Sequence, residues 1–394
     1  MNQMQDQDRG AGTGIESLVQ SLGRGRITRL QFIQRAALLG LSASAIGAFL
    51  AACGTGEPEA KPSAMDTTVP KVLNYYTWAE YIDPKVKQAF TKKTGIKVVE
   101  TNFNDMDVLY AKAQAQGGKL DVDIIVPSDY MVSIMRKSNM LQSLDMKYIP
   151  NFQYVAEQFR KPSFDPETDG KKYSIPYMWG SLGIGVRLDK VKDPITGWAN
   201  LWDPQYKGQI NMQDSSRPTV GSALKLLGYS LNSTDETEIN EAGDKLIEQK
   251  PLVAQYDTVS PYRNMAMGVP LVHCYNGEVI QAINFAGTSP DVLQYVSPSE
   301  GYMLFVDNYC IPRGAPSPYA AHLFMDFILD PEIEVQNASW IGFFPPEEEA
   351  MAGLDPTVRA LVPDAATLAR GEITDDVGEA EALYTDAWRR VKSA

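Results

Sequence analysis

Short apolar runs and amphipathic segments alternate along most of the chain. The apolar run 72–76 predicts a β-strand, and the run 96–100 predicts the next one. Between them, Asp83 and Pro84 supply the N-cap and the first-turn proline of a helix that Gly95 ends. This strand–helix–strand order is typical of an α/β sheet covered by helices.

The same alternation continues downstream. A helix is predicted over 108–116, followed by a strand at 123–127 that is apolar enough to be buried on both faces of a sheet. The glycine-rich segment 175–186 predicts an extended crossover into a second set of elements. That set contains predicted strands at 209–212, 271–275 and 302–311 and a helix at 318–329.

Two α/β lobes joined by extended strands follow from this order. We assign residues 71–177 and 304–350 to the first lobe, and 178–303 and 351–394 to the second. A cleft between two such lobes is where a small ligand is expected to bind.

The first 52 residues have the pattern of an export signal. A basic leader precedes the uncharged stretch 36–50, which is too short and too weakly apolar for a membrane-spanning helix. The stretch ends in Leu50-Ala51-Ala52-Cys53-Gly54, which resembles the bacterial lipobox and predicts lipid attachment at Cys53. Residues 53–70 then predict a flexible tether. The segment 28–34 resembles a twin-arginine motif with leucine in place of the second arginine, so twin-arginine and Sec export both stay open.

Overall charge and residue usage exclude several classes of protein. The net charge of -13 argues against a nucleic-acid partner. Three cysteines without C-x-x-C spacing predict no metal or redox site, and whether Cys274 and Cys310 pair stays open. Only two histidines occur, and His273 is expected to be a hydrogen-bonded core residue. With no assembled catalytic motif, we predict a protein that is not an enzyme and needs no cofactor.

Aromatic and acidic residues gather at the predicted strand ends, where open α/β sheets bind ligands. Carboxylates can pair with ammonium groups, and aromatic faces attract cations. The candidate ligand-binding residues are Trp78, Glu80, Tyr81, Ser128, Tyr130, Tyr275, Glu278, Phe305 and Asp307, with Asp129, Asp214, Ser215, Arg217 and Phe343 as further candidates. The ligand class that this set predicts is a small organic cation.

Motifs along residues 71–394 resemble those of bacterial spermidine/putrescine-binding periplasmic proteins. They include 76–82 (YTWAEYI), 126–130 (VPSDY), 173–180 (YSIPYMWG), 201–208 (LWDPQYKG) and 275–278 (YNGE). The resemblance implies a type II periplasmic-binding-protein fold, capture of a polyamine outside the cytoplasm, delivery to the permease of an ABC importer, and membrane contact only through the lipid anchor.

The resemblance also implies roles for single residues. Trp78, Tyr130 and Tyr275 would pack on the polyamine chain, and Glu80 and Asp307 would bind its ammonium groups. Glu278 stands where putrescine-binding members carry a shorter acid. The chain departs from the family around Arg217, where Ser215 and Pro218 replace acids, and Tyr275 and Phe305 replace tryptophans.

These departures leave the ligand open between alternatives. With two well-placed acidic sites, a diamine is expected to bind at least as well as spermidine. The first alternative is another small amine or amino acid such as 4-aminobutyrate, with Arg217 holding its carboxylate. The second is a ligand-binding lipoprotein that serves a sensory receptor instead of an importer.

Overall fold

The computed structural model describes residues 65–168 and 170–394. The predicted signal peptide, the lipidation site at Cys53 and the tether up to residue 64 lie outside these residues. Within the described ranges, no helix combines the length and the apolar character needed to span a membrane.

The described part is an α/β structure built on one strongly mixed sheet. Its strand order is β2-β1-β3-β9-β4-β7-β5-β6, with β10 beside β9 and β8 beside β4. The strands are β1 (Val72–Trp78), β2 (Lys97–Phe103), β3 (Ile124–Ile125), β4 (Ser174–Arg187), β5 (Ile210–Met212), β6 (Val253–Tyr256), β7 (Leu271–Tyr275), β8 (Leu293–Val296), β9 (Tyr302–Cys310) and β10 (Gly371–Ile373).

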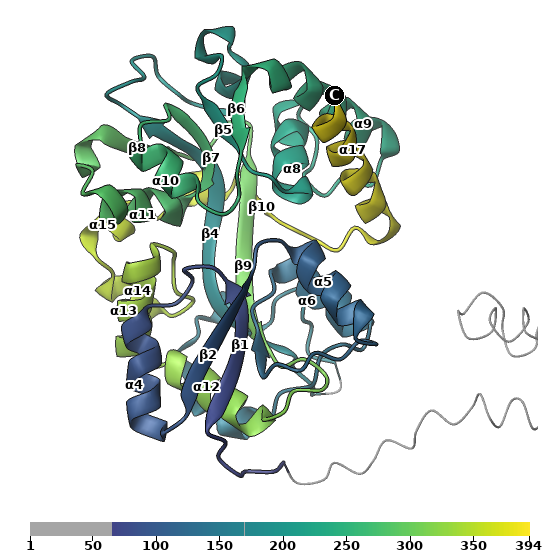
Figure 1. Cartoon of the computed structure of the whole chain (residues 1–394), viewed down its shortest axis with the longest axis vertical. Helices are drawn as coiled ribbons and strands as arrows, with labels where there is room; N and C mark the ends of the chain where they lie inside the picture. Colours follow the sequence, from purple (N-terminus) through teal and green to yellow (C-terminus); the bar gives the residue numbers. More distant parts are fainter. Residues whose placement is uncertain (1–64, 169) are drawn as a thin grey trace, which may run out of the picture. The chain divides into compact units, whose positions relative to one another are not determined.

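The helices lie on both faces of this sheet (Figure 1). The α-helices are α4 (Pro84–Thr94), α5 (Met106–Ala115), α6 (Asp129–Lys137), α7 (Glu157–Arg160), α8 (Ser216–Leu226), α9 (Glu236–Gln249), α10 (Pro261–Ala266), α11 (Asn276–Ala286), α12 (Pro318–Ile328), α13 (Pro331–Ile341), α14 (Glu348–Gly353), α15 (Pro356–Arg359), α16 (Ala365–Leu368) and α17 (Glu381–Ser393). The 3₁₀ turns are η1 (Met146–Tyr148), η2 (Pro150–Tyr154), η3 (Trp198–Trp202), η4 (Pro204–Tyr206), η5 (Lys250–Leu252), η6 (Pro290–Val292) and η7 (Gly378–Ala380).

Local signals explain why α4 forms where the sequence predicts it. The Asp83 side chain accepts a hydrogen bond from the Lys85 N–H, Pro84 opens the first turn, and Gly95 ends the helix in the left-handed conformation with φ of 79°. Val86 and Phe90, four residues apart, are the buried face of this helix. The strand predicted at 123–127 is shorter in the structure, where β3 covers Ile124–Ile125. Directly before it, the Asp123 carboxylate accepts hydrogen bonds from the N–H groups of Asn74 and Ser317.

The two longest central strands, β4 and β9, run antiparallel through both halves of the sheet (Figure 1). At one end, Met178 and Phe305 belong to an apolar core shared with α4, α12 and α13. At the other end, Leu182 and Tyr302 belong to a separate core shared with α8, α9 and α17. We call the part around the first core, with β1–β3, the first lobe and the part around the second core, with β5–β7, the second lobe.

The sequence-based lobe boundaries stay a prediction. Leu354 and Val358, which fall in the range 351–394 assigned to the second lobe, pack in the core of the first lobe. Tyr384 and Val391 on α17 pack in the core of the second. The C-terminal segment therefore contributes side chains to both cores.

Two further expectations concern buried side chains. Cys274 and Cys310 are both buried and free. In the sheet, Cys274 lies opposite Gly183 of β4 and Cys310 lies opposite Ser174 of the same strand. The stretch of β4 between these two positions separates the cysteines by roughly 30 Å. His273 is buried against Trp198, but neither ring nitrogen has a hydrogen-bond partner among the described residues, so the expectation of a hydrogen-bonded histidine is wrong. Burial lowers its pKa to about 3, which keeps the ring neutral.

Candidate functional site

A cavity of about 150 Å³ lies between the two lobes. Its walls come from the ends of β1, β2 and β7, from the middle of β9, and from α5, α6, α8, α10 and α11. The structure brings together most of the predicted residues on these walls: Trp78, Glu80, Tyr81, Ser128, Tyr130, Ser215, Arg217, Tyr275, Glu278, Phe305, Asp307 and Phe343.

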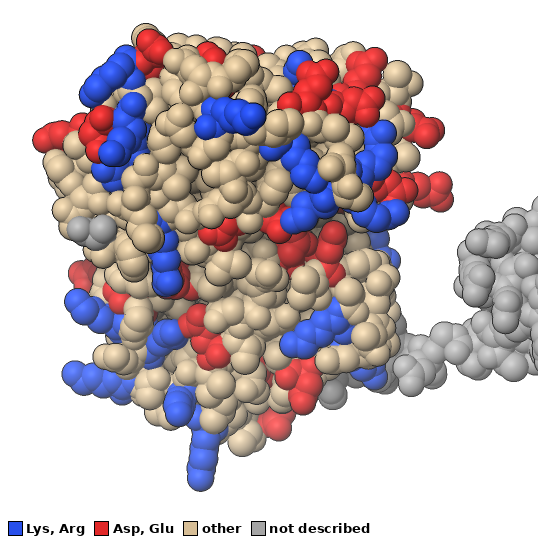
Figure 2. Space-filling model, turned by 45° about the horizontal axis from the view of Figure 1, so that its top comes forward, with Lys and Arg blue, Asp and Glu red and all other residues tan. Residues whose placement is uncertain are grey.

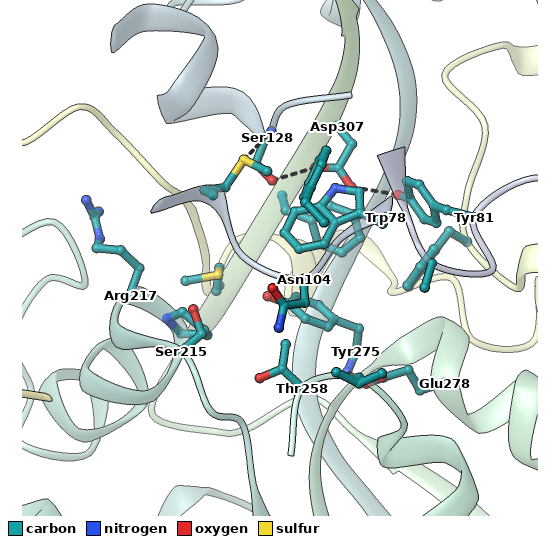
Figure 3. Close-up of a pocket in the computed structure, with 18 of the residues that line it drawn as sticks. Trp78, Tyr81, Asn104, Ser128, Ser215, Arg217, Thr258, Tyr275, Glu278 and Asp307 are labelled. Atoms are coloured by element: carbon teal, nitrogen blue, oxygen red, sulfur yellow. Dashed lines mark hydrogen bonds between the residues drawn. The ribbon is translucent and has the colours of Figure 1, made fainter. Parts of the chain in front are cut away.

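Asp307 on β9 is a buried carboxylate held by two hydroxyl groups. Its Oδ1 accepts a hydrogen bond of 2.6 Å from Ser128 Oγ, and its Oδ2 accepts one of 2.7 Å from the Tyr81 hydroxyl (Figure 3). No Lys or Arg of residues 65–168 or 170–394 forms an ion pair with Asp307. Burial raises its pKa to about 6, while the two hydroxyl donors act in the opposite direction. The donors therefore orient a carboxylate whose negative charge has no internal counter-ion.

Glu278 is a second buried acid, in the first turn of α11. Its Oε2 accepts a hydrogen bond of 2.8 Å from the backbone N–H of Tyr275, the N-cap residue, so the side chain also caps its own helix. Burial raises its pKa to about 8, and Asp257 acts in the same direction. The described part of the chain supplies no cationic side chain to it. A positive ligand group bound beside Glu278 would favour the ionised form of this carboxyl.

Aromatic rings surround the two acids. Tyr275 stands edge-on to Phe305 at 5.2 Å between ring centroids, and Phe305 stands edge-on to Phe343 at 5.3 Å. Tyr81 joins the same cluster through Phe343 at 5.6 Å. Burial and the nearby carboxyls of Asp307 and Glu278 raise the pKa of the Tyr275 hydroxyl, so this ring lies within electrostatic reach of both acids. Such walls suit a chain of methylene groups between two charged ends.

Glu80 lines the cavity at its outer edge and differs from the two inner acids. Its side chain is 49% exposed and forms an ion pair of 3.4 Å with Arg263 on α10. It has a left-handed backbone conformation, with φ of 54°. The acid that the resemblance assigns to an ammonium group thus has a cation from the opposite lobe beside it.

Arg217 lines the cavity, but its guanidinium is directed toward other protein groups (Figure 3). Its Nη1 pairs with Glu381 Oε2 at 2.7 Å, and its Nη2 donates to Asn232 Oδ1 at 3.0 Å. The guanidinium also lies over the Tyr130 and Tyr384 rings. These contacts are those of a structural ion pair between segments.

Asp129 and Asp214, which the sequence offered as further candidates, are absent from the cavity walls. Asp129 is fully buried and accepts hydrogen bonds from Thr374 Oγ1 and from the Val306 N–H. Asp214 pairs with Lys392 at 2.6 Å on the surface. Both carboxyls are thereby committed to partners within the protein, so their placement at strand ends was a misleading signal.

The cavity also includes polar residues that the sequence analysis missed. Asn104, Thr258, Tyr262 and Gln281 all line it. Asn104 directly follows β2 and Thr258 lies two residues after β6. The strand-end rule that selected Ser128 could therefore have selected both, if neutral side chains had been included.

Known proteins match this chain over most of its length. The model of the bacterial extracellular solute-binding protein family matches residues 85–362. The spermidine/putrescine-binding periplasmic protein of Salmonella typhimurium is 36% identical over 327 residues, which is 82% of this chain and 91% of that protein.

Solved structures agree with the sequence matches. The spermidine/putrescine ABC transporter substrate-binding protein of Streptococcus pneumoniae has a TM-score of 0.68 at 32% identity, over 82% of this chain and 99% of that one. A lipoprotein of Treponema pallidum has a TM-score of 0.72 at 28% identity, over 81% of this chain and 99% of that one. The members of this family bind solutes for transport and are not enzymes. The chain therefore belongs to the bacterial extracellular solute-binding proteins, together with the spermidine/putrescine-binding periplasmic proteins.

Proposed function

We propose that this protein captures a polyamine in the cavity between its lobes and delivers it to the permease of an ABC importer. The observation that carries the proposal is the pair of buried acids, Asp307 and Glu278, which face one aromatic cavity without a cationic partner in the described chain. A buried, unpaired carboxylate costs several kcal/mol, so an arriving ammonium group would be strongly favoured beside Asp307, and beside Glu278 once that acid has lost its proton.

The two acids support a ligand with a positive group at each end. Tyr275, Phe305 and Phe343 offer apolar ring surface for the methylene chain between those ends. The Ser128 and Tyr81 hydroxyls are already committed to Asp307, which fixes the acid and leaves its remaining lone pairs for the ligand. A diamine such as putrescine satisfies both ends of this arrangement.

Capture of 4-aminobutyrate is the weaker proposal. It would need a free cation for the ligand carboxylate, and the sequence offered Arg217 for that task. The Arg217 guanidinium is held by Glu381, Asn232 and two tyrosine rings. A ligand carboxylate would have to compete with those partners.

The place of action follows from the family and from the leader sequence. Extracellular solute-binding proteins work outside the cytoplasm, and we propose that this one is held to the membrane by lipid on Cys53. The lipobox-like segment 50–54 supports this, and the Treponema pallidum relative is itself described as a lipoprotein. Cells expressing the full chain should incorporate labelled palmitate, and Cys53→Ser should abolish the label; label that persists in the variant would rule the anchor out.

Titration calorimetry of residues 65–394, freed of bound ligand by partial unfolding and refolding, tests the binding proposal. Putrescine and spermidine should each bind with one site per chain, and 4-aminobutyrate should bind far more weakly. Tight 4-aminobutyrate binding that Arg217→Met abolishes would replace the polyamine proposal. Adjacent genes for a receptor in place of a permease and an ATPase would favour the sensory alternative.

A further inference from the structure

One ion pair crosses the mouth of the cavity between the lobes. Glu80 follows β1 in the first lobe, and Arg263 lies on α10 in the second, 183 positions later in the chain. Their side chains meet at 3.4 Å, and each is 49% exposed. Arg263 itself is not one of the cavity-lining residues, whereas its neighbour Tyr262 is. The pair therefore stands at the rim of the site.

The second lobe holds the Arg263 guanidinium in place. Its Nε donates a hydrogen bond of 2.7 Å to the Tyr262 hydroxyl. The guanidinium also lies 5.4 Å from the centre of the Tyr262 ring and 5.2 Å from that of Phe285. These contacts reduce the rotamer freedom of a long side chain and orient it at the rim, next to Glu80.

The distribution of counter-ions over the three cavity acids is uneven. Asp307 and Glu278 lie inside and have no cationic partner in the described ranges, whereas Glu80 has Arg263. We infer that Arg263 is a specificity-determining residue: its guanidinium occupies the side of Glu80 that the third ammonium group of a triamine would need. The cavity then accommodates two ammonium groups inside and disfavours a third at the rim. This inference rests on the proposed capture of polyamines.

The size of the effect follows from the exposure of the pair. Half-exposed ion pairs contribute up to about 1 kcal/mol, which corresponds to roughly a fivefold change in an equilibrium constant. A third ammonium group that displaces Arg263 from Glu80 exchanges one such pair for another and gains little. With the guanidinium removed, the same ammonium group would gain the full attraction of Glu80.

The pair could instead act by holding the lobes together, and the two roles predict different results. A contact that only favours closure would help every ligand by the same factor, since closure is common to all of them. A contact that neutralises Glu80 would act on a triamine and leave a diamine nearly unaffected. The ratio of spermidine to putrescine affinity separates the two roles, whereas either affinity alone does not.

The test is calorimetric titration of Arg263→Met, which retains much of the apolar stem, with putrescine and with spermidine. Spermidine affinity relative to putrescine should rise about threefold to fivefold over the wild type. Arg263→Lys, which keeps the charge, should stay near the wild-type ratio. Arg389→Ala removes an exposed arginine of the second lobe that pairs only locally with Asp386, and it serves as the matched control.

The double variant Glu80→Gln/Arg263→Met decides whether the gain acts through Glu80. The rise in the ratio should disappear in the double variant. An unchanged ratio in Arg263→Met, an equal loss for both ligands, or a rise that persists without Glu80 would each overturn the inference while leaving polyamine capture intact. A wild-type protein that binds neither polyamine would overturn the proposed function, and this inference with it.

Discussion

Two pairs of buried acids in this protein have opposite surroundings. Asp307 and Glu278 face the cavity, and each has hydrogen-bond donors on its carboxyl group. Glu334 on α13 and Glu347 before α14 are fully buried in the first lobe. None of the four carboxyl oxygens of this second pair has a hydrogen-bond partner in another described residue.

The difference lies in the hydrogen-bond donors and the adjoining cavity and not in the pKa alone, because burial raises the pKa of both Glu278 and Glu347 to about 8. Burial raises the pKa of Glu347 to about 8, and burial together with repulsion from Glu347 raises the pKa of Glu334 well above its usual range. Without donors or solvent, at least one of these two acids stays protonated at neutral pH. Around Asp307, by contrast, the Ser128 and Tyr81 hydroxyls stabilise the ionised form. Burial alone therefore does not mark a binding site; burial with oriented donors and an adjoining cavity does.

The surface of the protein adds a third environment. Lys and Arg side chains are interspersed with Asp and Glu on the face seen in Figure 2. Pairs such as Lys392 with Asp214 and Arg389 with Asp386 are of this kind. They contribute little individually. The net charge of -13 thus says less about the ligand than the two unpaired acids in the cavity do.

The largest effect is expected at Asp307. Asp307→Asn should weaken putrescine binding at least tenfold, because a charge-assisted hydrogen bond to an ammonium group contributes about 1.5–3 kcal/mol. The amide oxygen can still accept from one of the Ser128 and Tyr81 hydroxyls, and the amide NH2 can donate to the other once that hydroxyl hydrogen rotates away, so the fold is retained. Glu334→Gln makes the same chemical change in the core and should leave the affinity within about twofold, as measured by calorimetry.

If both amide variants weaken binding alike, the contrast between the two pairs is wrong and a general loss of lobe stability explains both. If neither does, Asp307 does not bind an ammonium group. Thermal melts of the two variants without ligand provide the control for folding.

A smaller effect on putrescine affinity is expected from the protonation of Glu278. Because burial raises the pKa of Glu278 to about 8, the acid is largely protonated at pH 7 before an ammonium group reaches it. Binding should therefore release a proton, and affinity should fall as the pH is lowered from 8 to 6. Glu278→Gln should weaken putrescine threefold to tenfold, more than Ser215→Ala does, and should reduce the proton release.

Calorimetry in buffers of different ionisation enthalpy measures this proton directly. Glu334→Gln is again the matched control, since a core acid that no ligand reaches should keep the wild-type proton release. Equal proton release in wild type and Glu278→Gln would assign the titrating group elsewhere, with Asp307 as the first alternative.

The elements of the fold could be predicted because their signals are local. The cap at Asp83, the left-handed Gly95 and the apolar run of β7 all act within a few residues of the element they define. The hydrogen bonds of Asp123 could not be predicted, since its partners are backbone groups of Asn74 and Ser317, far away in sequence.

The binding site was predicted in composition but not in detail. Strand ends meet at one edge of a sheet, so Ser128 and Tyr275 could be grouped without a structure, whereas Asp307 lies inside β9 and this rule does not place it. The pairing of Glu80 with Arg263 depends on how the two lobes come together, and that of Arg217 with Glu381 depends on how α17 packs beside α8 within the second lobe. No spacing rule relates residues that are more than 150 positions apart.

The smallest effect on ligand binding is expected from the core pair, whose protonation acts on the stability of the fold. A carboxyl whose pKa is higher in the folded than in the unfolded state stabilises the fold fully below the unfolded value of about 4.3, and this contribution is lost as the pH rises. For Glu347 the loss extends up to its folded pKa of about 8. The wild type should therefore unfold more easily at pH 8 than at pH 5. Glu347→Gln, which cannot ionise, should reduce that pH dependence by about 3–4 kcal/mol between pH 5 and pH 8 in urea unfolding. The exposed Glu157→Gln should leave it unchanged. A variant with the same pH dependence as the wild type would show that Glu347 ionises in the folded protein, and the contrast with the cavity acids would no longer hold.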